Sequence, residues 1–131
     1  MTTVLLIEYP PAVRDALRAR LSLERDLDIV GEADNAAQGI SMAHALEPDV
    51  VLIDAETPDL DAAEIVRVLA QEKRRPRIVV LSQHAAAIAR GVTGTPAVIV
   101  TKYAGYTSLV GAIRQACARP AAFRTGDVGR R

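Results

Sequence analysis

Aromatic residues and cysteine are scarce in this chain of 131 residues. Phe, Trp and Tyr together make up 3% of it, and tryptophan is absent. Because half of the residues are hydrophobic, the core has to be built from aliphatic side chains and alanine. The single cysteine, Cys117, excludes an internal disulfide bond, and we expect it to act as a small buried hydrophobic residue. This cysteine usage favours a reducing compartment, and we expect a cytoplasmic location.

Net charge and long apolar runs are absent as well. Lys plus Arg and Asp plus Glu number 16 each, so the formal net charge is zero. A balanced chain argues against non-specific binding of nucleic acid by this domain itself. No apolar run approaches the roughly 20 residues that span a bilayer, and no basic segment precedes the apolar start as in a signal peptide. We therefore expect no membrane attachment.

Five short apolar runs predict β-strands, at residues 4–8, 28–33, 50–54, 77–82 and 97–102. Four of them are continuous rather than alternating, which is typical of strands covered on both faces in a parallel sheet. The run at 28–33 is more polar and is expected at an edge. Helical spacing fills the intervals: a first helix with Val13, Ala16, Leu17 and Leu21 on one face, then 35–47, 61–71, 84–91 and 106–118.

The alternation of strand and helix, repeated five times, predicts the fold class. It is α/β, a doubly wound five-stranded parallel sheet of flavodoxin-like (βα)5 type with strand order 2-1-3-4-5. The length fits one compact domain, which we place at residues 1–119. Residues 120–131 are rich in Pro, Gly and Arg without apolar periodicity, and they are expected to be a linker or a disordered tail.

Five polar residues stand at or just beyond the expected strand ends: Glu8, Asp54, Glu56, Ser82 and Lys102. Ligands of open α/β sheets bind at this edge. Glu8 and Asp54 follow adjacent central strands, so they should lie roughly 5 Å apart. Carboxylates, a hydroxyl and an ammonium group together suit phosphoryl transfer to a carboxylate.

In that chemistry Asp54 is the nucleophile, while Lys102 and Ser82 contact the phosphoryl oxygens. Mg²⁺, which prefers oxygen ligands, would be held by Glu8, Asp54 and Glu56. Two plainer interpretations stay open. Asp54 could simply cap the turn that follows it, and Glu8 could form a salt bridge to Lys102 instead of serving a metal.

The segment DVVLIDAETPDLDAAEIVRVL, residues 49–69, resembles the phosphoacceptor segment of response-regulator receiver domains of two-component systems. Asp54 falls on the phosphoacceptor position of that family. Ser82, in VVLS, falls on its Ser/Thr switch position, and Lys102, in VIVTK, falls on its lysine. The resemblance implies no enzyme activity beyond, at most, self-catalysed phosphoryl transfer to Asp54.

The segments RDALRARL (14–21) and LVGAIRQA (109–116) are similar to the first and fifth helices of the LuxR/NarL-type subgroup. The resemblance extends over residues 3–119. It implies a homodimer, a histidine kinase as partner, and control of transcription through DNA bound by a separate C-terminal helix-turn-helix domain that is not in this sequence.

The chain departs from the family pattern at two important positions. Tyr9 replaces the second of two adjacent acidic residues, usually the direct metal ligand, and its bulk could also occupy the cavity. Ile99 stands at a switch position where Tyr or Phe is typical. Against these changes, Glu56 could lean in and partly restore the lost charge, and Glu8 is one methylene longer than the usual Asp.

Two functions therefore stay open. The first is an atypical receiver, a signalling and dimerisation module that works without phosphorylation or responds to a small-molecule ligand, with an impaired Mg²⁺ pocket. The alternative is a conventional receiver that a histidine kinase phosphorylates on Asp54. Tyr9 and Ile99 favour the first, whereas Asp54, Ser82, Lys102 and Glu56 favour the second.

Overall fold

A computed structural model describes residues 1–118, and it has the α/β fold expected from the sequence. The expected linker at 120–131 lies outside the described residues. The strands are β1 (Thr2–Ile7), β2 (Leu27–Ala33), β3 (Val50–Asp54), β4 (Arg77–Ser82) and β5 (Val98–Thr101). The helices are α1 (Pro11–Leu21), α2 (Ala36–Leu46), α3 (Ala62–Leu69), α4 (Ala85–Gly91), the 3₁₀ helix η1 (Lys102–Ala104) and α5 (Tyr106–Ala118).

Local sequence explains where several helices begin. Proline at the first position of α1 needs no hydrogen-bonded partner for its nitrogen. Asn35 caps α2 by accepting a hydrogen bond from the backbone N–H of Gln38. Asp61 caps α3 in the same way, accepting from the N–H of Glu64.

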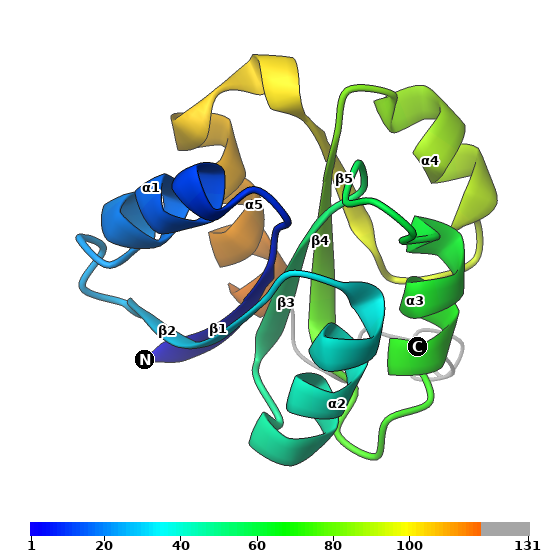
Figure 1. Ribbon diagram of the computed structural model, residues 1–131, viewed down its shortest axis with the longest axis horizontal. Helices are drawn as coiled ribbons and strands as arrows, with labels where there is room; N and C mark the ends of the chain where they lie inside the picture. Colours follow the sequence, from blue (N-terminus) through cyan, green and yellow to red (C-terminus); the bar gives the residue numbers. More distant parts are fainter. Residues whose placement is uncertain (119–131) are drawn as a thin grey trace.

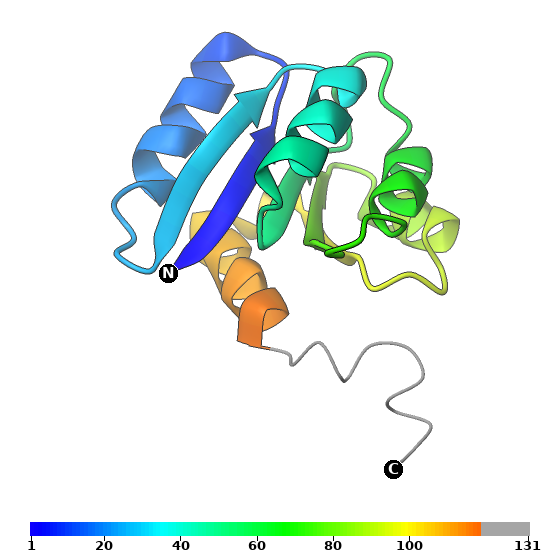
Figure 2. The same ribbon diagram turned by 90° about the horizontal axis from the view of Figure 1, so that it is seen from below.

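All five strands are parallel, in the order β2-β1-β3-β4-β5 (Figure 1). The order and the edge position of β2 are those predicted. Figure 2 shows α1 and α5 on one face of the sheet and α2, α3 and α4 on the other. Each face carries its own aliphatic core, and β1 and β3 contribute fully buried residues to both. None of the helices within residues 1–118 is long and apolar enough to cross a bilayer.

The apolar face of α1 differs from its sequence-based expectation. Leu21 is fully buried and Leu17 is partly buried, but Ala16 is exposed and Val13 is 50% exposed. The reason lies in the packing of the two helices on this face of the sheet. Helix α1 packs on β1 and β2, whereas α5 packs on β3, β4 and β5. The part of the apolar stripe that contains Val13 and Ala16 therefore faces a gap between α1 and α5.

Candidate functional site

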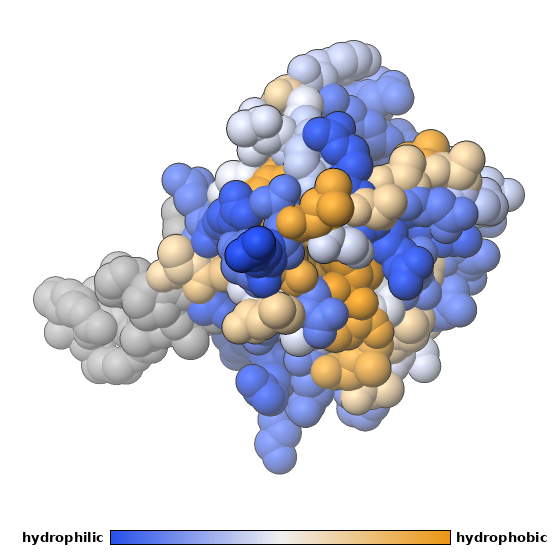
Figure 3. Space-filling model, turned by 90° about the vertical axis from the view of Figure 1, so that its left-hand side faces the viewer, coloured by the Kyte–Doolittle hydropathy of each residue, from blue (hydrophilic) through white to orange (hydrophobic). Residues whose placement is uncertain are grey.

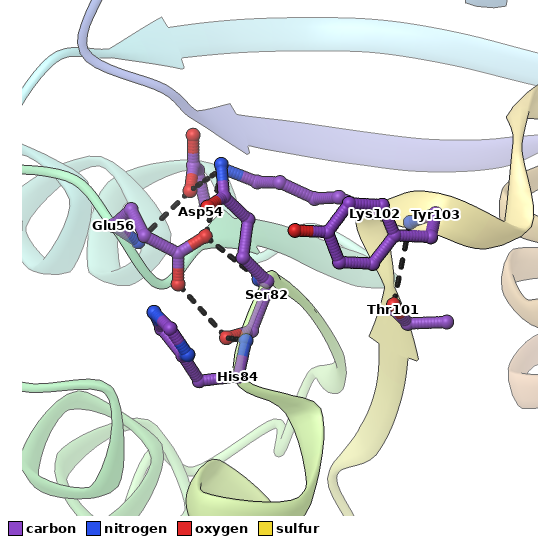
Figure 4. A network of polar contacts seen from close by, with 8 residues as sticks. Asp54, Glu56, Ser82, His84, Thr101, Lys102 and Tyr103 are labelled. Atoms are coloured by element: carbon purple, nitrogen blue, oxygen red, sulfur yellow. Dashed lines mark hydrogen bonds and ion pairs between the residues drawn. The ribbon is translucent and has the colours of Figure 1, made fainter.

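The strand register brings the expected polar residues to one edge of the sheet. Ile7 pairs with Ile53, so Glu8 and Asp54 leave adjacent strands at the same level. Ser82 ends β4, directly opposite Thr101 at the end of β5, and Lys102 follows at once. Figure 4 shows Asp54, Ser82 and Lys102 converging around Glu56.

Lys102 forms ion pairs with two carboxylates. Its Nζ lies 2.7 Å from Oδ1 of Asp54 and 2.9 Å from Oε1 of Glu56. The alternative pairing of Lys102 with Glu8 is not among the ion pairs of residues 1–118. The ammonium charge of Lys102 is therefore paired with one carboxylate at the end of β3 and one in the loop that follows it.

The Glu56 side chain turns toward the end of β4 (Figure 4). Its Oε2 accepts a hydrogen bond of 2.8 Å from the Ser82 hydroxyl, and its Oε1 accepts one of 2.9 Å from the backbone N–H of Gln83. The Ser82 oxygen in turn accepts from the backbone N–H of His84. The carboxylate of Glu56 thus interacts with an ammonium group, a hydroxyl and a backbone amide at the same time.

The ionisation of this cluster follows from its contacts. Burial opposes ionisation of Asp54, but contacts with Glu8, Lys102 and the backbone N–H of Glu56 outweigh it and hold the pKa of Asp54 below its ordinary value. Burial opposes ionisation of Glu56 as well, and Lys102, Gln83 and Ser82 again outweigh it, so its pKa is also lowered. Burial disfavours the Lys102 ammonium, yet the two carboxylates raise its pKa.

Glu8 behaves differently from the other two carboxylates. Its residue is only 2% exposed, and its Oε1 atom is buried without a hydrogen-bond partner. Burial, together with the adjacent Asp54 carboxylate, raises the pKa of Glu8 to about 8. Glu8 is therefore mostly a neutral acid at pH 7, and Asp54 carries the negative charge of the pair.

The side chain of Tyr9 does not fill the site, contrary to one expectation from the sequence. It is 50% exposed and is not among the residues that line the neighbouring cavity. The backbone carbonyls of Glu8 and Tyr9 accept hydrogen bonds from Nη1 of Arg14, which draw the corner toward α1. Ile99 is partly buried against the core under α2, α3 and α4.

Two participants were missed by sequence reasoning, the Gln83 N–H and Arg14. A backbone donor leaves no residue signature, so Gln83 could be found only from the loop geometry. Arg14 had a weak signal, because long side chains in the first turn of a helix point back toward its N-terminus.

The carboxylates expected to hold Mg²⁺ are largely engaged in other contacts. Glu8 is largely protonated, and both oxygens of Glu56 already accept from Lys102, Ser82 and Gln83. Oδ1 of Asp54 accepts from Lys102 and from the N–H of Glu56. Within residues 1–118 no group of three or more His, Cys, Asp and Glu side chains is arranged to hold a metal ion. In this arrangement most oxygens of the three carboxylates are therefore protonated or already paired.

The raised pKa of Glu8 predicts a pH-dependent stability. From pH 4.5, its ordinary value, to about pH 8, the folded state binds more protons than the unfolded state, so this group's stabilising contribution falls as pH rises. Glu8→Gln cannot ionise and keeps a donor toward Asp54. We expect thermal unfolding of the two proteins to coincide near pH 5, and the variant to melt several degrees higher at pH 8.5. Equal melting temperatures at pH 8.5, or the same gain in Glu64→Gln, would contradict this assignment.

A family model described as the response regulator receiver domain matches residues 4–114. The chain is 38% identical to the nitrate/nitrite response regulator NarL of Escherichia coli over 80 residues, 61% of this chain and 37% of NarL. It is 40% identical to the transcriptional regulatory protein BtsR of E. coli over 82 residues, 63% of this chain and 34% of BtsR.

Solved structures agree with the sequence relatives. The signal receiver domain of the response regulator NarL from Mycobacterium tuberculosis superposes with a TM-score of 0.79 at 27% identity, covering 90% of this chain and 98% of that domain. The matched segment is little more than a third of the full-length NarL and BtsR proteins of E. coli. Because the family model spans most of the sequence, the chain belongs to the response regulator receiver domain family.

Proposed function

We propose that this domain is an atypical receiver, which signals without a phosphoryl group on Asp54. One observation carries the proposal: the Glu56 carboxylate contacts Lys102 Nζ, Ser82 Oγ and the Gln83 N–H. An ammonium, a hydroxyl and an amide are the donors that would otherwise stabilise phosphoryl oxygens beside Asp54. Glu56 thus acts as a built-in anion in the place of a phosphoryl group.

The charge balance of the site supports the proposal. Asp54 and Glu56 together carry two negative charges against one on Lys102. On this proposal a phosphoryl group on Asp54 would bring further negative charge without a new cation, because most oxygens of Glu8, Asp54 and Glu56 are already protonated or paired. Repulsion between like charges at this distance costs several kcal/mol at the effective dielectric near a protein surface, roughly 4 kcal/mol for a pair at 4 Å.

The proposed output follows the family. Response regulators pair with histidine kinases, dimerise and bind DNA through an output domain, and BtsR is named a transcriptional regulatory protein. We propose that this domain is the dimerisation module of such a regulator, cytoplasmic, with DNA bound by a separate domain. On this account its state is set by Glu56, or by a ligand, rather than by a kinase.

The conventional function remains the second candidate, because Asp54, Ser82 and Lys102 do lie together at the expected edge. It requires Glu56 to release Ser82 and Lys102 when a phosphoryl group arrives. The two candidates differ in how the protein responds to a phosphoryl analogue.

Beryllium trifluoride with Mg²⁺ tests the proposal in the wild-type chain. We expect the amide NMR signals of Gln83 and His84 and the self-association constant to be unchanged, because Glu56 already occupies their donors. Glu56→Ala alone should shift both signals and change self-association by about threefold or more. Glu64→Ala, on an exposed turn of α3, is the matched control. Saturable shifts of Gln83 and His84 in the wild type would favour the conventional function.

A further inference from the structure

A cavity of about 360 Å³ lies between α1 and α5, directly beside the polar site. Its walls are apolar and come from Val13 and Leu17 of α1, Leu81 of β4 and Leu109 of α5. Figure 3 looks at the side of the molecule on which α1 and β2 lie, and it shows hydrophobic surface among hydrophilic residues. A volume of this size is within the usual range for small-molecule sites, about 300 to 1,000 Å³.

The cavity has a structural origin in the sequence. Helices α1 and α5 pack over different strands, and the residues facing the gap between them include Ala16 and Gly105, which have little or no side chain. With aromatic residues at only 3% of the chain, few large side chains are available to fill such a gap. The apolar stripe of α1 is thereby left partly exposed instead of joining the core.

One residue that lines the floor of the cavity, Glu8, has a buried acceptor atom without a partner. Glu8, Asp54 and Lys102 all line it, and Asp54 and Lys102 are engaged with each other. Oε1 of Glu8 has no hydrogen-bond partner, although its residue is 98% buried, being 2% exposed. A buried carboxyl oxygen without a partner is costly, and a ligand that donates a hydrogen bond to it would remove that cost.

The surrounding charges restrict what can bind. Of the charged residues that line the floor, Asp54 and Lys102 form an ion pair and Glu8 is mostly neutral, so the floor offers no net charge to attract an ion. At the rim the guanidinium of Arg20 lies 3.8 Å from the centre of the Tyr106 ring, which disfavours a cation and offers a flat surface. A neutral molecule with an apolar body matches both the uncharged floor and the apolar walls.

We propose that this cavity binds a neutral, largely apolar organic ligand whose hydroxyl or N–H group donates to Oε1 of Glu8. The site goes beyond the proposed function, since it exists whether or not Asp54 accepts a phosphoryl group. Because the ligand would contact the residues that hold Lys102 and would wedge α1 against α5, its binding would be sensed at the switch residue Ser82 through Asp54, Lys102 and Glu56.

The test uses 2-naphthol, a neutral aromatic donor, with 2-methylnaphthalene as an isostere without a donor and 2-naphthoate as an anion. Each probe is titrated into the methyl-labelled chain, and the methyl signals are followed by NMR. We expect saturable shifts of the Val13, Leu17, Leu81 and Leu109 methyls, with Leu69 on the opposite face unchanged. Binding of 2-naphthol should be about fivefold tighter than that of 2-methylnaphthalene, and 2-naphthoate should bind most weakly.

Two variants locate the site and its acceptor. Ala16→Phe fills the cavity from an exposed position of α1 and should weaken 2-naphthol at least about tenfold, whereas Ala19→Phe, on the same helix outside the cavity, should not. Glu8→Ala should abolish the preference for 2-naphthol over the isostere. Absent methyl shifts in the wild-type chain, or equal binding to Ala16→Phe, would overturn the site. An unchanged preference in Glu8→Ala would overturn the ligand class.

A second copy of the chain is the competing occupant. Dilution of the wild-type chain without probe distinguishes it, because a partner's side chain in the cavity would make the same methyl signals depend on protein concentration. Such a dependence would overturn the ligand proposal. Whether the cavity holds a ligand or a second copy of the chain, the expected response to beryllium trifluoride is the same. Failure of this inference is therefore distinguishable from failure of the proposed function.

Discussion

Replacing Lys102 with methionine is expected to lower the free energy of unfolding at pH 7.5 by about 2 to 3 kcal/mol. The substitution keeps an apolar stem but leaves Asp54 and Glu56 facing each other without their shared cation. Asp54 is only 6% exposed, so water cannot replace the ammonium there. This loss of stability is smaller than the usual cost of breaking a buried pair, because the side chains of Lys102 and Glu56 are 27% and 30% exposed.

The pH dependence of this loss identifies its cause. Glu8 and Lys102 hold the pKa of Asp54 below its ordinary value of 3.8, and Lys102, with Gln83 and Ser82, holds that of Glu56 below 4.5. The part of this stabilisation that comes from Lys102 is present above the ordinary values and is lost as the pH falls through the lowered ones. The gap between wild type and variant should therefore narrow below about pH 4.5. Urea unfolding followed by circular dichroism measures it, with Lys73→Met as an exposed control. A loss no larger than that of Lys73→Met would contradict the ion-pair network.

The double variant Tyr9→Asp, Glu56→Ala is expected to gain phosphorylation on Asp54. The first change supplies the second acidic residue that the family normally has after Glu8, and so restores oxygen ligands for Mg²⁺. The second change releases Ser82 Oγ, Lys102 Nζ and the Gln83 N–H from Glu56. With a small phosphodonor and Mg²⁺, labelling should rise at least about tenfold above the wild type, which corresponds to about 1.4 kcal/mol of transition-state stabilisation.

Two control proteins make this result specific. Adding Asp54→Asn to the double variant should remove the label, which places it on Asp54. The combination Tyr103→Asp, Glu56→Ala has the same composition but puts its new carboxylate on an exposed residue of η1, and it should label less. Equal labelling of the two double variants would show that Tyr9 is not what limits the metal site.

The fold and much of the site could be predicted from the sequence, because both depend on local pattern. Continuous aliphatic runs locate β1, β3, β4 and β5, and parallel register then brings Asp54, Ser82 and Lys102 to one edge whatever their side-chain conformations. The polar character of 28–33 correctly placed β2 at the edge of the sheet.

The remaining features depend on packing between distant elements. The direction of Glu56 is decided by an amide of the loop after β4, which no residue type reveals. The protonation of Glu8 depends on how completely the ends of β1 and β3 are covered. The exposure of Val13 arises because α1 and α5 pack on different strands of the sheet. Periodicity alone would place the whole apolar stripe of α1 in the core.

The central claim is that Glu56 takes the place of a phosphoryl group, and intact mass spectrometry of the wild-type chain tests it most directly. The chain is incubated with a small phosphodonor and Mg²⁺ beside its Asp54→Asn variant. The account predicts no added phosphoryl group in either protein. One phosphoryl group on the wild type that is absent from Asp54→Asn would contradict it, and would establish the domain as a conventional phosphoacceptor.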